Sequence, residues 1–185
     1  MVNFVNDYWY IWVVALFVAI IVEIMLICNR HLARSSPINY ILLAIFTICE
    51  AYSVSATSVY YALDSPWIVI ESFVGTVAIT LACTFYALTT KNDFTILGSM
   101  AWLVVSALLF CIIIMAVTHF TFFLYDLLIA FCVFLFGIYL IVDVQMIVGS
   151  GRWKLSVDDY ILGALILFVD IITIFLYLLS LFGGR

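Results

Sequence analysis

Long apolar stretches constrain this chain more strongly than any other feature of its sequence. Of its 185 residues, 69% are hydrophobic and 9% are charged, whereas an ordinary globular domain carries about 25% charged residues. A helix needs roughly 20 mainly apolar residues to cross about 30 Å of hydrocarbon. Six stretches satisfy this requirement: 8–28, 38–61, 67–89, 94–117, 122–148 and 157–181. The sequence therefore predicts an all-α, polytopic transmembrane helical bundle of about six spans, a single transmembrane domain over residues 1–185.

The short loops between these stretches carry basic residues alternately. Arg30 and Arg34 lie in the first loop, Lys91 in the third, and Arg152 and Lys154 in the fifth, whereas the second and fourth loops have neither Lys nor Arg. Loops rich in Lys and Arg stay on the cytoplasmic side of a membrane. We therefore expect the odd-numbered loops in the cytosol and both termini on the opposite side.

Composition argues against several classes of function. The net charge of −5 argues against nucleic-acid binding, which needs a basic face. The cysteines stand singly in apolar stretches, so we expect small buried hydrophobes rather than disulfides or a zinc site; they are Cys28, Cys49, Cys83, Cys111 and Cys132. No nucleophile with its base, HExxH pattern or phosphate-binding glycine loop is visible, so we expect neither an enzyme nor a resident cofactor.

Four acids fall inside the predicted spans: Glu23, Glu50, Asp143 and Asp170. An ionisable residue at the centre of a span costs about 2.5–3.5 kcal/mol on insertion scales and is a functional hypothesis by default. No Lys or Arg lies inside any predicted span. These acids must therefore be protonated, hydrogen-bonded, hydrated or bound to a cation.

Counting about 1.5 Å of rise per residue estimates the depth of each acid. Glu23 and Asp143 lie roughly 8 Å inside the cytosolic boundary, and Glu50 and Asp170 lie near mid-membrane. Because Ca²⁺ prefers carboxylate and carbonyl oxygens, Asp143, Asp170 and Glu50 are candidates for transient calcium binding. Glu23 has an alternative role as an interfacial acid that reaches the cytosolic edge or pairs with Arg30.

Hydroxyl side chains accompany Glu50 along the second span. Thr47, Ser53 and Thr57, with Ser58, recur on or near one helical face. Together with Glu50 and Glu23 they form a candidate ion pathway. The alternative is that these hydroxyls join neighbouring helices by hydrogen bonds, a common use of Ser and Thr in membranes.

Asp143 and Asp170 come from helices joined by a short loop, so their helices are expected to be antiparallel neighbours. Counting places the two acids about 12 Å apart in depth; tilt, a fifth helix reaching past Gly149 and a sixth helix beginning near Tyr160 would close most of that gap. Two carboxyls that meet in a low dielectric cannot both ionise cheaply, so they would share a proton and sense pH. Alternatively, each Asp is protonated and bonds a backbone carbonyl.

The last third of the chain also carries a recognisable pattern. It consists of residues 142–149 (VDVQMIVG), Leu155-Ser156, Asp158-Asp159-Tyr160, Gly163-Ala164-Leu165 and residues 168–172 (FVDII). This pattern resembles the signature of the transmembrane Bax inhibitor motif family and is most similar to its Lifeguard branch. Residues 37–39 and 90–95 are similar to further motifs of that branch.

The resemblance implies a seven-helix fold, of which this chain would begin at the second helix. It also implies a pH-sensitive calcium leak channel of the endoplasmic reticulum or Golgi that protects against cell death, with Asp143 and Asp170 as the acid-sensing pair. Some members latch that pair with an arginine from the family's second helix, but residues 8–28 contain no arginine. The expected partners are the lipid bilayer, calcium ions and apoptosis-regulating membrane proteins.

Two other functions are consistent with the same residues. A proton-coupled transporter would use Asp143 and Asp170 to relay protons, and its flux would follow the proton gradient. A regulator without transport activity would act through helix contacts with partner membrane proteins, and neutral substitutions at both aspartates would leave protection of the cell intact.

Overall fold

The computed structural model of the chain describes residues 9–95, 122–149, 152 and 154–184. Its elements are α2 (Trp9–Cys28), α3 (Arg30–Arg34), α4 (Ile38–Asp64), α5 (Pro66–Thr89), α7 (Phe122–Val148), the short 3₁₀ helix η2 (Val157–Asp159) and α8 (Tyr160–Gly183). Five of these are long and apolar enough to cross a membrane. The described part contains no strand, and the all-α fold class is confirmed. The predicted span 94–117 lies outside the described residues, apart from its first two positions.

Turn chemistry sets the helix boundaries. Between α4 and α5 the chain is extended at Ser65 and has Pro66 at the first turn of α5, where the missing N–H of proline is tolerated. At the end of α7, Gly149 adopts a φ of +75°, a conformation that favours glycine, and its N–H bonds the carbonyl of Gln145 at 3.0 Å. Helix α7 therefore ends at Val148, which confirms the predicted end of the span 122–148. An extension past Gly149, considered above as one way to bring the two acids together, is not found.

After α7 the chain doubles back before α8 begins. The N–H of Leu155 donates to the carbonyl of Met146 at 2.9 Å. Ser156 then caps η2, because its hydroxyl accepts from Asp158 N while Asp159 accepts from Ser156 N. This reciprocal arrangement is a capping box. The last spanning helix, α8, begins at Tyr160, three residues after the predicted start of the span at residue 157, because η2 occupies those three residues.

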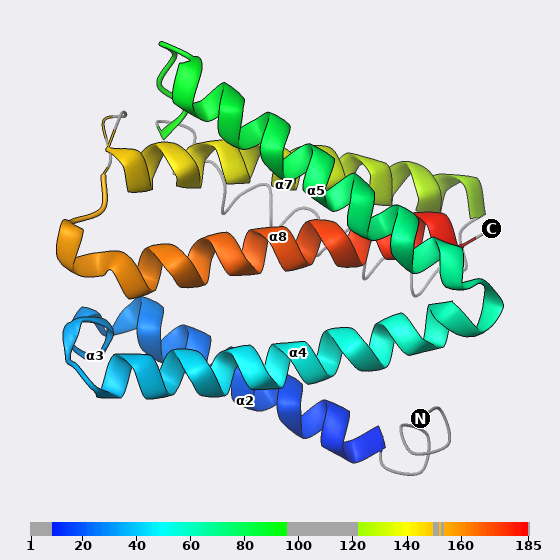
Figure 1. Cartoon of the computed structure of the whole chain (residues 1–185), viewed down its shortest axis with the longest axis horizontal. Helices are drawn as coiled ribbons and strands as arrows, with labels where there is room; N and C mark the ends of the chain where they lie inside the picture. Colours follow the sequence, from blue (N-terminus) through cyan, green and yellow to red (C-terminus); the bar gives the residue numbers. More distant parts are fainter. Residues whose placement is uncertain (1–8, 96–121, 150–151, 153, 185) are drawn as a thin grey trace.

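Helix α8 lies at the centre of the bundle, with α5 and α7 on one side and α2 and α4 on the other (Figure 1). One apolar cluster joins α2, α4 and α8 and contains Leu26, Phe46 and Leu165. A second joins α5, α7 and α8 and contains Leu140 and Ile174. The central helix is therefore packed on both sides, and this position brings its one acid into the interior.

The described cysteines form no disulfide with one another, and their environments differ. Cys132 is buried and Cys49 and Cys83 are half-buried, in line with small hydrophobes. Cys28 is exposed, so the prediction of burial is wrong for this residue, because it closes α2 on a face that no other described helix covers. Cys111 lies outside the described residues.

Candidate ion site

The structure brings Asp143 of α7 and Asp170 of α8 together. Their carboxyl groups lie within hydrogen-bonding reach of one another. The Asp170 side chain is 6% exposed, and Asp143 is half-buried. The two acids therefore form one local pair between the central helix and its antiparallel neighbour.

The loop geometry explains why counting residues overestimated their separation. Because the chain doubles back from Gly149 to Leu155, α8 starts beside the last turn of α7, and a side chain at Gly163 would approach Ile147 to 3.4 Å. Side chains of a helix tilt toward its N-terminus. In antiparallel helices these tilts are opposed, and at this register they point the Asp143 and Asp170 carboxyls toward each other.

The surroundings of the pair provide no base. None of the five described spanning helices contains Lys or Arg. Within the described residues, Oδ2 of Asp170 has no hydrogen-bond donor. A hydrogen bond between two carboxyl groups needs a proton on one of them, and two like charges in contact in a low dielectric are unfavourable. The arrangement is chemically suited to hold a single proton or to share a cation.

A second acid pair lies across α2 and α4. Glu23 and Glu50 are both half-buried, and the charge of Glu23 acts electrostatically on Glu50. The ion pair found within 4.0 Å in the described chain joins Arg34 to Asp159, so the alternative pairing of Glu23 with Arg30 is wrong. No described group of three or more His, Cys, Asp or Glu side chains is arranged to hold a metal ion.

The hydroxyls near Glu50 bond their own helix. Thr47 donates to Leu43 O at 2.8 Å, Ser53 to Cys49 O at 3.0 Å, and Thr57 to Ser53 O at 2.9 Å. Each hydroxyl hydrogen is thus used within α4, and these bonds do not join α4 to another helix. The oxygen atoms keep a free lone pair that can accept from water.

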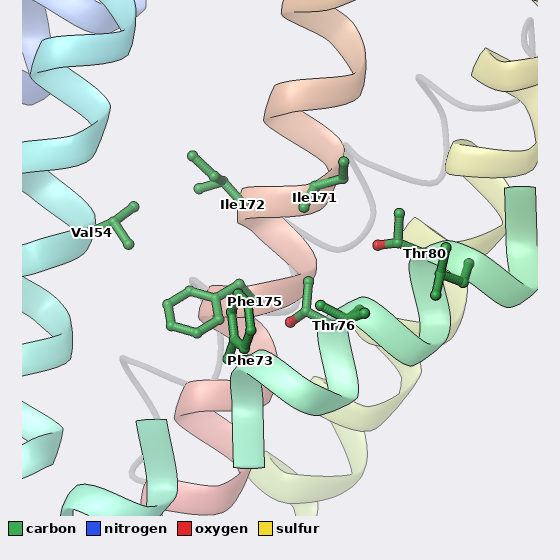
Figure 2. A pocket seen from close by; sticks show the side chains of 9 residues that line it. Val54, Phe73, Thr76, Thr80, Ile171, Ile172 and Phe175 are labelled. Atoms are coloured by element: carbon green, nitrogen blue, oxygen red, sulfur yellow. The ribbon is translucent and has the colours of Figure 1, made fainter. Parts of the chain in front are cut away.

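An apolar cavity of about 470 Å³ lies between α4, α5 and α8. Figure 2 shows Val54 on one side and Phe73, Thr76 and Thr80 on the other, with α8 behind them. The Thr76 hydroxyl already donates to Ser72 O at 2.7 Å. A cavity with apolar walls stays dry, so this space does not offer a water route to the acid pair.

Sequence reasoning missed the role of Gln145, which is 2% exposed near the end of α7. Its Oε1 accepts from the N–H of Phe94 at 2.9 Å, and its Nε2 donates to the carbonyl of Asn92 at 2.9 Å. These bonds fasten the loop after α5 to α7, two residues from Asp143. The signal was present in the sequence, because a glutamine buried among apolar residues needs partners for its amide.

The same loop is held by Asp93. Its carboxylate accepts from the Thr95 hydroxyl at 2.6 Å, from the Thr95 N–H at 3.0 Å and from the Arg152 N–H at 2.8 Å. The Thr95 hydroxyl bond, aided by the bonds and charge of Arg152, holds the pKa of Asp93 below its ordinary value of 3.8. The loop after α5 and the loop after α7 are thus joined.

An ion pair at the same end was also missed. Arg34 of α3 donates from Nε and Nη2 to the two oxygens of Asp159 at 2.7 and 2.9 Å. Asp159 is 1% exposed, and two parallel bonds of this kind fix geometry as well as charge. The first loop is therefore clamped to the start of α8.

A known protein family matches the chain over its full length. The whole chain, residues 1–185, matches the family model described as inhibitor of apoptosis-promoting Bax1. The chain belongs to this Bax inhibitor family. The resemblance noted in its last third is thereby confirmed, and the acid pair falls within the part that carries it.

Curated relatives support the same assignment within the Bax inhibitor family. The chain is 28% identical to protein lifeguard 3 of Homo sapiens over 178 residues, covering 95% of this chain and 56% of that protein. It is 28% identical to protein lifeguard 3 of Mus musculus over 182 residues, covering 95% of this chain and 57% of that protein. It is 31% identical to the Golgi anti-apoptotic protein of Vaccinia virus (strain Lister) over 157 residues, covering 83% of this chain and 60% of that protein. The chain thus spans less than two thirds of each relative's length.

Proposed function

We propose that this Bax inhibitor family member is a pH-sensitive leak channel for calcium or a similar cation. The channel would reside in an intracellular membrane, that of the endoplasmic reticulum or the Golgi, where it would modulate calcium stores and cell death. The observation that carries the proposal is the contact between Asp143 and Asp170, in a bundle whose described spanning helices contain neither Lys nor Arg. The Vaccinia relative named a Golgi anti-apoptotic protein supports the Golgi and the link to cell death.

The proposed pH response follows from charge balance at the pair. With one proton, Asp143 and Asp170 share a hydrogen bond and hold α7 against α8. Without it, two negative charges face each other, and they repel unless a cation or water separates them. Protonation and cation binding are therefore alternative ways to neutralise the same two carboxylates.

Calcium suits such a pair as a passing ion rather than a resident one. Ca²⁺ takes six to eight oxygen ligands, and the two carboxylates supply at most four. Water must complete the coordination, which favours entry and exit over permanent binding. Glu23 and Glu50 supply a second pair of carboxylates in the other half of the bundle, at the proposed start of the pathway.

The test is calcium efflux from liposomes that contain the purified protein, over a pH series. Asp143→Asn and Asp170→Asn remove one charge each, and Asp126→Asn is a matched control because it changes an acid near the opposite end of the same helix α7. We expect a protein-dependent leak whose pH profile shifts or flattens in the two pair variants and is unchanged in the control. The direction of the wild-type response is left to the measurement.

Two results would contradict the channel. One is the absence of leak above protein-free liposomes at every pH, with correct insertion verified. The other is flux that follows an imposed proton gradient and saturates with substrate, which would indicate a proton-coupled transporter.

A second candidate is a regulator that protects cells through contacts with partner membrane proteins. The name of the Vaccinia relative, an anti-apoptotic protein, favours protection without specifying transport. This candidate predicts that the double variant Asp143→Asn, Asp170→Asn keeps full protection in a cell-death assay. A leak channel predicts that protection changes together with the calcium leak.

A further inference from the structure

An aromatic pocket of about 250 Å³ lies between α2 and α4, away from the acid pairs. It is lined by Trp12, Ala56, Thr57, Tyr60 and Tyr61. Trp12 stands in the first turn of α2, and the two tyrosines stand in the last turn of α4. These two helix ends point to the same side of the bundle (Figure 1), opposite the clamp at Arg34.

The depth of the pocket places it at the boundary between hydrocarbon and headgroups. Tyr61 and Tyr60 lie three and four residues before the end of α4 at Asp64, about 5–6 Å from that end at 1.5 Å per residue. Tyr60 is 69% exposed, so its ring is open to a ligand. A molecule that enters here comes from the headgroup layer.

The ring arrangement suits a cation. The Tyr60 and Tyr61 rings are perpendicular, with centroids 5.8 Å apart, and Trp12 supplies a third ring. Gly183 leaves no room for a side chain beside the Tyr61 ring, which allows α8 to pack there. Faces of Trp and Tyr attract cations, and groups of such rings recognise quaternary ammonium ions.

The charge around the pocket points to the same ligand. Asp64 and Glu71, at this end of α4 and α5, are exposed acids. The Lys and Arg residues of the described chain gather at the other end, at positions 30, 34, 91, 152 and 154. A cationic group of a headgroup would find these two acids nearby.

We propose that this pocket binds the quaternary ammonium of a choline phospholipid headgroup. The Trp12 and Tyr60 rings contact the methylated nitrogen. A primary ammonium of the same charge is compact and strongly hydrated, so it gives up more hydration on entering the aromatic pocket. The inference concerns a lipid site and does not depend on the leak activity.

The experiment measures lipid selectivity by native mass spectrometry of the whole protein in detergent. The protein is mixed with equal amounts of dioleoyl phosphatidylcholine and dioleoyl phosphatidylethanolamine, which differ only in the methylation of the nitrogen. A cation–π contact at an exposed site corresponds to about a two- to five-fold change in binding constant. We expect at least such an excess of bound phosphatidylcholine for the wild type.

The variants separate this pocket from a general aromatic belt. Trp12→Leu and Tyr60→Leu should abolish the phosphatidylcholine excess, whereas Tyr60→Phe keeps the ring and should retain it. Trp67→Leu is the matched control, because Trp67 is also 69% exposed at the same end and does not line the pocket. Melting curves of all variants verify folding.

Three outcomes would overturn the proposal. The wild type could bind both lipids equally, or Trp12→Leu and Tyr60→Leu could retain the full excess. In the third case, Trp67→Leu would lose the excess as completely as the pocket variants, and interfacial aromatic residues in general would explain it.

Discussion

Replacing Gln145 with leucine removes the contact that fastens the loop after α5 to α7. Two hydrogen bonds of 2.9 Å are lost, each worth about 0.5–1.5 kcal/mol net. The half-buried N–H of Phe94 then lacks its partner, so the loss of its bond costs the desolvation of this N–H, about 1–3 kcal/mol, in place of the net value. The carbonyl of Asn92 adds less, because Asn92 is exposed to water. We expect Gln145→Leu to lower the free energy of unfolding by about 2–4 kcal/mol.

The assay uses the chain's own thiols. Cys132 is 1% exposed, so a maleimide dye reacts with it when the bundle opens, and the reaction reports the melting temperature of the purified protein. For chains of 150–250 residues, about 2–4 °C corresponds to 1 kcal/mol, so Gln145→Leu should melt roughly 5–10 °C lower. Asn92→Ala is the control, because Gln145 bonds the backbone of Asn92 and not its side chain. The reasoning is refuted if Gln145→Leu melts with the wild type, or if the control falls equally.

Two other perturbations probe the same end of the bundle. The pKa of Asp93 is lowered in the folded chain, so its carboxylate stabilises the fold at neutral pH, and this contribution is lost as the pH falls below about 3.8 and through the lowered pKa. Asp93→Asn should therefore have a lower melting temperature than the wild type at pH 7. Over a pH series, the melting temperatures of the two proteins should converge toward acid pH. Arg34→Lys keeps the charge but not the two parallel bonds to Asp159, so its melting temperature should lie between those of the wild type and Arg34→Ala. If Arg34→Lys melts at the same temperature as the wild type, the paired geometry contributes nothing to stability.

The sequence predicts the membrane-spanning helices well, because the lengths of its apolar stretches show where they lie. Five predicted spans coincide with described helices, because uninterrupted hydrophobic runs and the breaks at Pro66 and Gly149 determine where a helix can cross. The largest boundary differences are three residues long: α8 begins at Tyr160 rather than at Val157, and α4 continues to Asp64 rather than Tyr61. Three further residues extend the helix until Ser65 becomes extended before proline, as the residue before a proline tends to do.

Contacts between distant residues were harder to predict than helices. Arg34 and Asp159 are 125 positions apart, so no local pattern in the sequence pairs them. The meeting of Asp143 with Asp170 was expected only as a possibility, because counting along each helix ignores how the loop returns. The hydrogen bond from the Leu155 N–H to the Met146 carbonyl shows where the loop returns beside α7, and this sets the position of α8 along α7.

The position of α8 ties the acid pair to the rest of the bundle. In the proposed pH response, loss of the shared proton would make Asp143 and Asp170 repel each other and push α8 away from α7. The other side of α8 packs on α4, where the Phe46 and Phe168 rings lie edge to face at 5.8 Å. Its first turn is also held through Asp159. A shift of α8 is therefore passed to α4, because a close-packed interior transmits strain instead of absorbing it. On this argument a change of protonation at one acid pair reaches the helix that carries the other, which is the coupling a pH-sensitive pathway requires.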